Sequence, residues 1–302
     1  MRRVWRCAGL RWSVDGPVLM WGDGRGSSLG WGKRVAFGVV EGGVRTCVGA
    51  RGHACPVAAV VSGRSTGVRC EECARLDRTH SVAADTVADD PRPYRVYLAW
   101  FGPGMVKVGI TRVERGSARL LEQGAVVFSW LGQGPLMAAR RAEELLRAAL
   151  KVPDRIPYAD KRVVRAGLPG PGERVVRAGL PGPGERVAEI RELHERVGRL
   201  DAWPESLQRA PFEPVDHTEV FGLAGLGPAV GVVSELVPGG VVSGELCAAA
   251  GPDLHLRTGR GVVVLDTRLM TGWELTAAGD GAAGLSVPVR ELRDSTVQDG
   301  LF

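Results

Sequence analysis

The chain has 302 residues, of which 44% are hydrophobic and 24% are charged. This composition excludes a disordered or fibrous chain and favours one large globular domain or two smaller ones. The formal net charge of +5 is unevenly distributed. Residues 1–200 contain 33 Lys+Arg and 20 Asp+Glu, giving +13, and residues 201–302 contain 6 and 14, giving −8.

The basic first two thirds of the chain could meet a polyanion such as nucleic acid, and the acidic last third could not do so easily. Only 4 of the 39 basic residues are lysines, and the chain has 43 glycines. This usage is typical of GC-rich coding DNA, so the arginine content is weak support for phosphate binding. The start of the chain lacks the apolar run of a signal peptide, and glycines, prolines and Glu235 interrupt its most apolar stretch. We therefore expect no membrane span and a cytoplasmic protein.

Residues 1–46 are predicted to be a β-rich region, because the short apolar runs RVWRCAGLRW, PVLMWG and RVAFGVV alternate with Gly/Asp/Ser turns. This region contains four tryptophans, and packing in the core or on a sheet face is a more economical interpretation than a stacking platform. They are Trp5, Trp12, Trp21 and Trp31.

Residues 47–78 contain a cluster of cysteines with the spacing C-x7-C-x14-C-x2-C, namely Cys47, Cys55, Cys70 and Cys73. The knuckle RCEEC presents two thiolates from one turn, which suits tetrahedral zinc, and four thiolates indicate a structural rather than a catalytic ion. The first spacing is longer than usual, so His53 could replace Cys55 as a ligand. Buried reduced cysteines and disulfides are the alternatives. Cys7 and Cys247 are predicted to be core residues.

Residues 79–93 are expected to form a linker, and residues 94–160 an α/β unit. Two strands flank the Gly-Pro-Gly of VYLAWFGPGMVKVGIT, and a helix (ERGSARLLEQ), a strand (AVVFSWLG) and a strong helix (GPLMAARRAEELLRAAL) follow.

Residues 161–200 contain a tandem repeat, VVRAGLPGPGER, at 163–174 and 175–186, and we expect a mobile surface loop there, followed by a helix over 187–200. Residues 201–302 are predicted to be a C-terminal β-rich region that could pair with the N-terminal one.

The hairpin resembles that of GIY-YIG nucleases: RVY (95–97) stands where Gly-Ile-Tyr would be, and KVGIT (107–111) stands where Tyr-Ile-Gly and a Ser or Thr would be. The wider order of cysteines, hairpin, RLLEQGA (119–125) and AEELLRAALKVPDRI (142–156) is similar to the bacterial domain of unknown function numbered 2797. The resemblance implies an α+β fold: a GIY-YIG-like small sheet with helices, preceded by a zinc-knuckle segment and flanked by β-rich regions.

The resemblance also implies a site for phosphodiester chemistry. Tyr97 would place a phenol beside the attacking water, Arg119 would clamp the phosphate, and a glutamate would hold Mg²⁺. Glu143 shares the apolar face of its helix, and either a metal or an arginine partner could explain its position. Glu144 lies on a basic stripe and is expected to be ion-paired.

Lys107 departs from the pattern, because it replaces the second tyrosine. It could donate to phosphate, or it could mark loss of catalysis with binding retained. The leading expectation is a zinc-containing, nucleic-acid-binding protein with Mg²⁺-dependent phosphodiester cleavage. A non-catalytic nucleic-acid or protein interaction module and a small-molecule enzyme on the same scaffold remain as alternatives.

Overall fold

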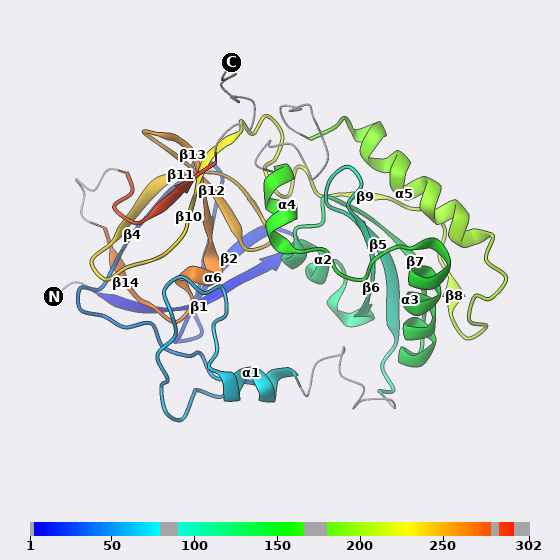
Figure 1. Cartoon of the computed structure of the whole chain (residues 1–302), viewed down its shortest axis with the longest axis horizontal. Helices are drawn as coiled ribbons and strands as arrows, with labels where there is room; N and C mark the ends of the chain where they lie inside the picture. The colour runs from blue at the N-terminus through cyan, green and yellow to red at the C-terminus, as the bar shows by residue number, and fades with distance from the viewer. Residues whose placement is uncertain (1–2, 79–89, 166–179, 279–283, 293–302) are drawn as a thin grey trace, which may run out of the picture. The chain divides into compact units, whose positions relative to one another are not determined.

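The computed structural model describes residues 3–78, 90–165, 180–278 and 284–292. Two compact units are present: the first unit comprises residues 1–11, 16–77 and 225–302, and the second comprises residues 12–15 and 78–224. The described part of the chain is mixed α/β and mostly sheet, with six α-helices (Figure 1). None of the helices in these described ranges is long and apolar enough to cross a membrane.

The first unit is built on a ten-stranded sheet with the order β15-β10-β13-β12-β11-β4-β14-β1-β2-β3. The strands are β1 Val4–Ser13, β2 Gly16–Trp21, β3 Gly26–Ser28, β4 Arg34–Val39, β10 Ala229–Val233, β11 Val241–Ala250, β12 Asp253–Thr258, β13 Gly261–Asp266, β14 Glu274–Ala277 and β15 Val289–Glu291. The helices are α1 Glu71–Arg78 and α6 Thr267–Met270.

The N-terminal and C-terminal β-regions share this sheet, as the sequence had suggested. Strand β4 pairs with β11 and β14, and β1 also pairs with β14, all antiparallel. The central strands β12 and β13 bury apolar side chains on both faces, with Leu254, Leu256, Val263, Val264 and Leu265 at most 1% exposed. The two β-rich ends of the chain therefore form one hydrophobic core.

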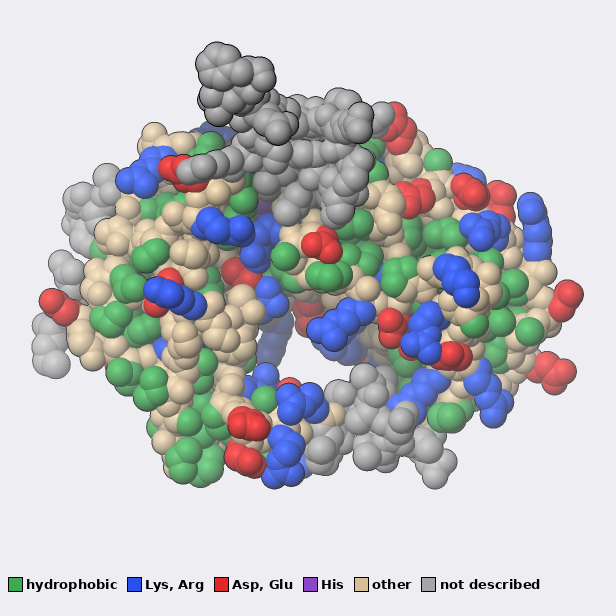
Figure 2. All heavy atoms as spheres, in the orientation of Figure 1, with side chains coloured by type: hydrophobic (Ala, Val, Ile, Leu, Met, Phe, Trp, Pro, Cys, Tyr) green, Lys and Arg blue, Asp and Glu red, His purple; other side chains and the backbone are tan. Residues whose placement is uncertain are grey.

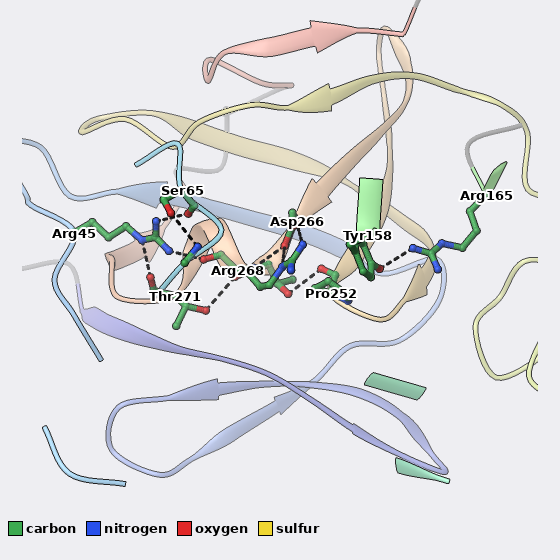
Figure 3. Close-up of polar contacts among 10 residues, drawn as sticks. Arg45, Ser65, Tyr158, Arg165, Pro252, Asp266, Arg268 and Thr271 are labelled. Atoms are coloured by element: carbon green, nitrogen blue, oxygen red, sulfur yellow. Dashed lines mark hydrogen bonds and ion pairs between the residues drawn. The ribbon is translucent and has the colours of Figure 1, made fainter. Parts of the chain in front are cut away.

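A buried arginine ties the cysteine-containing loop to this sheet (Figure 3). The Arg45 guanidinium, in a residue only 1% exposed, donates to the carbonyl oxygens of Ser62 and Ser65 at 2.6 Å each. It also donates to those of Arg268 at 2.6 Å and Thr271 at 2.8 Å, in and beside α6. Four carbonyl acceptors compensate the cost of burying the charge.

The second unit contains a five-stranded sheet in which β5 lies between β6 and β7, antiparallel to both. Its strands are β5 Tyr94–Trp100, β6 Val106–Arg112, β7 Val127–Gly134, β8 Gln208–Arg209 and β9 Val215–Asp216. Its helices are η1 Val113–Arg115, α2 Ala118–Gln123, α3 Leu136–Leu150, α4 Tyr158–Arg165 and α5 Pro183–Gly198.

The predicted hairpin, third strand and following helices of the 94–160 region are confirmed as β5, β6, α2, β7 and α3. The hairpin turn closes by hydrogen bonds from the Phe101 N–H to the Met105 carbonyl and from the Met105 N–H to the Gly102 carbonyl. Gly104 adopts φ +67°, which glycine tolerates best. Helix α2 ends at Gly124, whose left-handed conformation lets its N–H cap Leu120 and Leu121. Helix α3 packs on β5, β6 and β7 through its buried apolar stripe.

The tandem repeat is partly helical, which differs from the predicted loop. The first copy begins within α4, and α5 begins at Pro183 of the second copy rather than at residue 187. Proline is tolerated there because the first turn of a helix needs no N–H from it. The expected mobility of the remaining repeat, residues 166–179, lies outside the described residues. Residues 201–224, assigned from sequence to the C-terminal β-rich region, lie in the second unit, where β8 and β9 pair with β7.

The four N-terminal tryptophans do not share one environment. Trp12 is 4% exposed and packs edge-to-face on Phe221. Trp5 and Trp21 are half-buried, and Trp31 is 39% exposed. The core interpretation holds for Trp12 and is wrong for Trp31.

Candidate functional sites

The four predicted cysteine ligands converge in the first unit. The Sγ atoms of Cys47, Cys55, Cys70 and Cys73 all lie within 4.8 Å of one another. His53 is exposed and is not part of this group, so Cys55 takes the place that the sequence left open. All four cysteines are free thiols, which rules out the disulfide alternative in this structure. The cluster could hold one metal ion.

Backbone turns bring these thiols together. Cys70 directly precedes α1, and Cys73 lies in its first turn. Gly49 adopts φ +81°, and a Cβ there would overlap the carbonyl oxygen of His53. The N–H groups of Gly49 and Cys70 point at the Cys47 sulfur at 3.3 and 3.2 Å. Such N–H donors stabilise a thiolate, which is the form that binds metal.

Cys55 and Cys73 differ in how easily their thiols ionise. The N–H groups of Ala59 and Val57 lower the pKa of Cys55 to about 7. Burial, followed by the neighbouring thiols, raises the pKa of Cys73 to about 12. Four sulfurs this close repel each other's negative charge, so a cation is required to hold all of them as thiolates. This donor set fits Zn²⁺, which prefers four tetrahedral sulfur ligands.

Cys7 is fully buried, as expected, and burial raises the pKa of its thiol to about 11. Cys247 is only partly buried on β11, which differs from its predicted core position.

The second site gathers the residues that the GIY-YIG resemblance singled out. Tyr97 on β5 lies opposite Gly109 on β6, and Lys107 lies two residues before Gly109 on the same face. The Lys107 ammonium is 6.0 Å from the centre of the Tyr97 ring. Charges on Arg119 and Glu143 affect the pKa values of both Tyr97 and Lys107, so all four residues belong to one electrostatic cluster. We call Tyr97, Lys107, Arg119 and Glu143 the phenol–lysine cluster.

Tyr97 forms the buried floor of this cluster. The residue is 1% exposed, its hydroxyl accepts a 3.0 Å hydrogen bond from Gln123, and burial raises its pKa. A Cβ at Gly109 would overlap Cζ and Oη of the phenol, so only glycine lets the ring lie across β6. The side chain is thus packed where a water-activating phenol beside substrate would need to be open.

Lys107 is held beside the chain that follows α3. Its Nζ donates a hydrogen bond to the carbonyl oxygen of Asp154 at 3.1 Å. The backbone N–H of Val108, the next residue, donates to the carbonyl oxygen of Pro153 at 2.9 Å. Burial, reinforced by Arg119, lowers the pKa of Lys107 to about 8, while Glu143 and Asp154 oppose this shift. The ammonium therefore titrates closer to neutral pH than an ordinary lysine.

The two glutamates of α3 separate as the sequence predicted. Glu144 is exposed and pairs with Arg147 at 2.6 Å. Glu143 is half-buried and, within the described ranges, makes no ion pair closer than 4.0 Å. Burial and then the Asp154 carboxylate raise the pKa of Glu143, and Lys107, Arg147 and Arg140 act in the opposite direction. A carboxylate whose ionisation is disfavoured by a neighbouring carboxylate forms, with that neighbour, a suitable donor pair for a hard divalent cation.

Arg119 is the most available arginine near the cluster. Its contact with Glu122 is long, at 3.9 Å, and about half of its side chain is exposed. Arg115 instead binds both carboxylate oxygens of Glu122 at 2.7 and 2.8 Å. Arg112 is engaged by the Tyr94 hydroxyl at 3.1 Å and by buried Asp90 at 3.4 Å. Arg119, which was predicted to clamp the phosphate, is therefore less engaged by other side chains than Arg112 or Arg115.

Sequence reasoning did not select Gln123, Gly109 or Asp154. Gln123 and Gly109 stand within the quoted motifs RLLEQGA and KVGIT, so a signal was present, but neither carries an ionisable group. Trp130 was also not selected: its ring lies 6.2 Å from that of Tyr97 and under the Arg95 guanidinium at 5.0 Å. Strand pairing between β5 and β7 places it there.

Basic side chains do not dominate either unit. On the face shown in Figure 2, arginines and lysines are interspersed with aspartates and glutamates. Net charge therefore says less about a partner than the contacts of individual residues do.

Comparison with known proteins provides the family but no activity. No curated protein and no solved structure matches the chain. The profile of a family described as "Protein of unknown function (DUF2797)" matches residues 32–275, which include the cysteine cluster and the phenol–lysine cluster. The chain belongs to this DUF2797 family.

Proposed function

We propose that this protein binds nucleic acid through the phenol–lysine cluster and cleaves a phosphodiester there with the help of Mg²⁺. The observation that carries the proposal is that burial shifts the pKa of Tyr97, Lys107 and Glu143 toward their neutral forms at one place. Perturbed titratable groups gather at functional sites because catalysis needs them. The β5–β6 hairpin followed by α2, β7 and α3 also agrees with the GIY-YIG resemblance.

Each side chain has a role that its environment suits. Lys107 and Arg119 bind the phosphate oxygens, one as a compact charge and the other as a planar donor. Glu143 and Asp154 would hold Mg²⁺, which stabilises the charge that develops on the phosphate. Tyr97 acts as a positioning residue: its ring supports Lys107, and its hydroxyl holds Gln123.

The cysteine cluster is proposed to be a structural zinc site that holds the loop over residues 47–73. Purified protein should contain one equivalent of zinc by elemental analysis, and Cys73→Ser should lose it. Cys247→Ser, which removes a thiol outside the cluster, is the matched control and should retain the metal. Reduced thiols of this kind fit the cytoplasm, where we place the protein.

Cleavage is tested with single- and double-stranded DNA and RNA in the presence and absence of Mg²⁺. Glu143→Gln should reduce the cleavage rate about 100-fold, the order of magnitude for losing one charge-stabilising group. Glu144→Gln is the matched control, because this neighbouring carboxylate is exposed and paired with Arg147, and it should cleave normally. Absence of cleavage by the unmodified protein would overturn the catalytic part of the proposal.

A non-catalytic binding module is the second candidate, and the burial of Tyr97 favours it. It predicts nucleic-acid affinity that falls steeply with salt but no cleavage of any substrate. Affinity that does not depend on salt would exclude nucleic acid for both candidates and point to a protein or a small molecule.

A further inference from the structure

A groove in the first unit, lined by no residue of either site described above, combines aromatic and basic side chains. Its volume is about 370 Å³. The lining residues come from the start of β1 and the residue before it, from the end of β2, and from the turn between β2 and β3; they are Arg3, Val4, Trp5, Arg6, Trp21, Gly22, Asp23 and Arg25. This volume is within the usual range for small-molecule sites.

The two indoles of this groove are held in place by their strands. Their ring centres are 6.1 Å apart, with an angle of 39° between the planes. Trp21 donates its Nε1–H to the Ser27 hydroxyl at 2.9 Å, and its backbone N–H donates to the backbone carbonyl oxygen of Arg25 at 2.9 Å. Trp5 is fixed by the pairing of β1 with β14. Both residues are only half-buried, so part of each indole faces the groove.

The groove carries a positive charge that is not neutralised locally. Arg25 is paired with Asp23, with its Nε 2.7 Å from Oδ2. The Arg3 guanidinium lies 5.7 Å from the centre of the Trp5 ring. Within the described residues, neither Arg3 nor Arg6 makes an ion pair closer than 4.0 Å. Arg6 follows Trp5 on β1 and lies beside Gly22, so its side chain points to the opposite face of the strand, and the Arg3 guanidinium is the free charge that lies beside the indoles.

We propose that this groove binds a nucleotide unit, with the base against Trp5 and Trp21 and the phosphate on Arg3. Bases stack on indoles whatever their sequence, and guanidinium groups bind phosphate through charge-assisted hydrogen bonds. An apolar ligand would leave the Arg3 guanidinium unused, and an inorganic anion would leave the indoles unused. All residues that line the groove come before residue 32, where the family match begins, and none of them belongs to the phenol–lysine cluster. The inference is thus independent of the proposed function.

A free nucleotide and a single-stranded nucleic acid share this chemistry, and the experiment separates them. Adenosine monophosphate and a short fluorescent oligothymidylate are titrated into the full chain, with tryptophan quenching and fluorescence anisotropy as readouts. Saturable quenching by the mononucleotide supports a free nucleotide as ligand, and binding of the oligonucleotide alone supports a strand. Binding of neither probe overturns the inference.

Variants locate the binding. Trp5→Ala and Arg3→Ala should each weaken binding about ten- to a hundredfold. Trp31→Ala, which removes an exposed tryptophan outside the groove, is the matched control and should bind normally. The arginine variant tests the groove even if Trp5→Ala fails to fold, because Arg3 is exposed. Equal binding by the arginine variant and the Trp31→Ala control would refute the assignment.

Discussion

Replacement of Lys107 by methionine is expected to stabilise the protein while impairing its function. The pKa of Lys107 falls from 10.5 to about 8 on folding, chiefly through burial. This difference of about 2.5 corresponds to about 3 kcal/mol of unfolding free energy at pH 7, where the lysine is charged in both states. Methionine has a similar length and no charge, but it loses the hydrogen bond to the Asp154 carbonyl, worth about 1 kcal/mol. A net gain of about 2 kcal/mol is expected.

The pH dependence follows from the direction of the shift. Between about pH 8 and 10.5 the unfolded chain binds a proton at Lys107 that the folded protein has lost, so stability rises with pH in this window. Urea unfolding at pH 7 and pH 10, without Mg²⁺, isolates this effect as a difference between variants: the stability advantage of Lys107→Met over the unmodified protein should shrink by about 2–3 kcal/mol from pH 7 to pH 10. The buried Cys7 thiol, whose pKa is raised to about 11, affects both proteins equally. Lys33→Met, at an exposed lysine, is the control and should behave like the unmodified protein.

Function should respond in the opposite sense. Nucleic-acid affinity at pH 7 should fall at least tenfold in Lys107→Met and should be unchanged in Lys33→Met, since only Lys107 is proposed to bind phosphate. The chain has only 4 lysines, so reductive ¹³C-methylation gives an NMR spectrum in which Lys107 can be assigned by its absence from the variant. Titration of Lys107 near pH 10.5, or a Lys107→Met protein that is less stable than the unmodified one, would refute this reasoning.

Three further substitutions test the geometry of the two units, each by urea unfolding. Gly109→Ala should lower the free energy of unfolding by about 1–3 kcal/mol, because its Cβ would overlap the Tyr97 ring. In a Tyr97→Leu background most of that loss should disappear, and additive losses from the two substitutions would contradict the overlap. Ala58→Gly should gain about 1 kcal/mol, because Ala58 is exposed and has φ +43°; a loss of stability would show that no strain is stored there. Arg45→Met should lose about 3 kcal/mol or more by leaving buried carbonyl groups unpaired, whereas exposed Arg51→Met should lose little.

Local patterns in the sequence were sufficient for β5, β6, α2, β7 and α3 of the second unit and for the cysteine ligands. The strands on either side of Gly-Pro-Gly and helix α3 were predictable because alternation and helical periodicity are properties of short segments. The ligand set was predictable because Cys70 and Cys73 share one turn and because few arrangements use four thiols. Only the choice between Cys55 and His53 required coordinates.

Contacts between distant residues were decided by the tertiary structure alone. Pairing of β4 with β11 joins segments about 200 residues apart, and no local pattern specifies which strands become neighbours. The same holds for burial: nothing near Arg45 in the sequence indicates that carbonyl groups of α6 will surround it. Tyr97 was identifiable as a motif residue, but its enclosure depends on the cross-strand position of Gly109. The sequence therefore determined which side chains were available, and packing determined which of them solvent and ligands can reach.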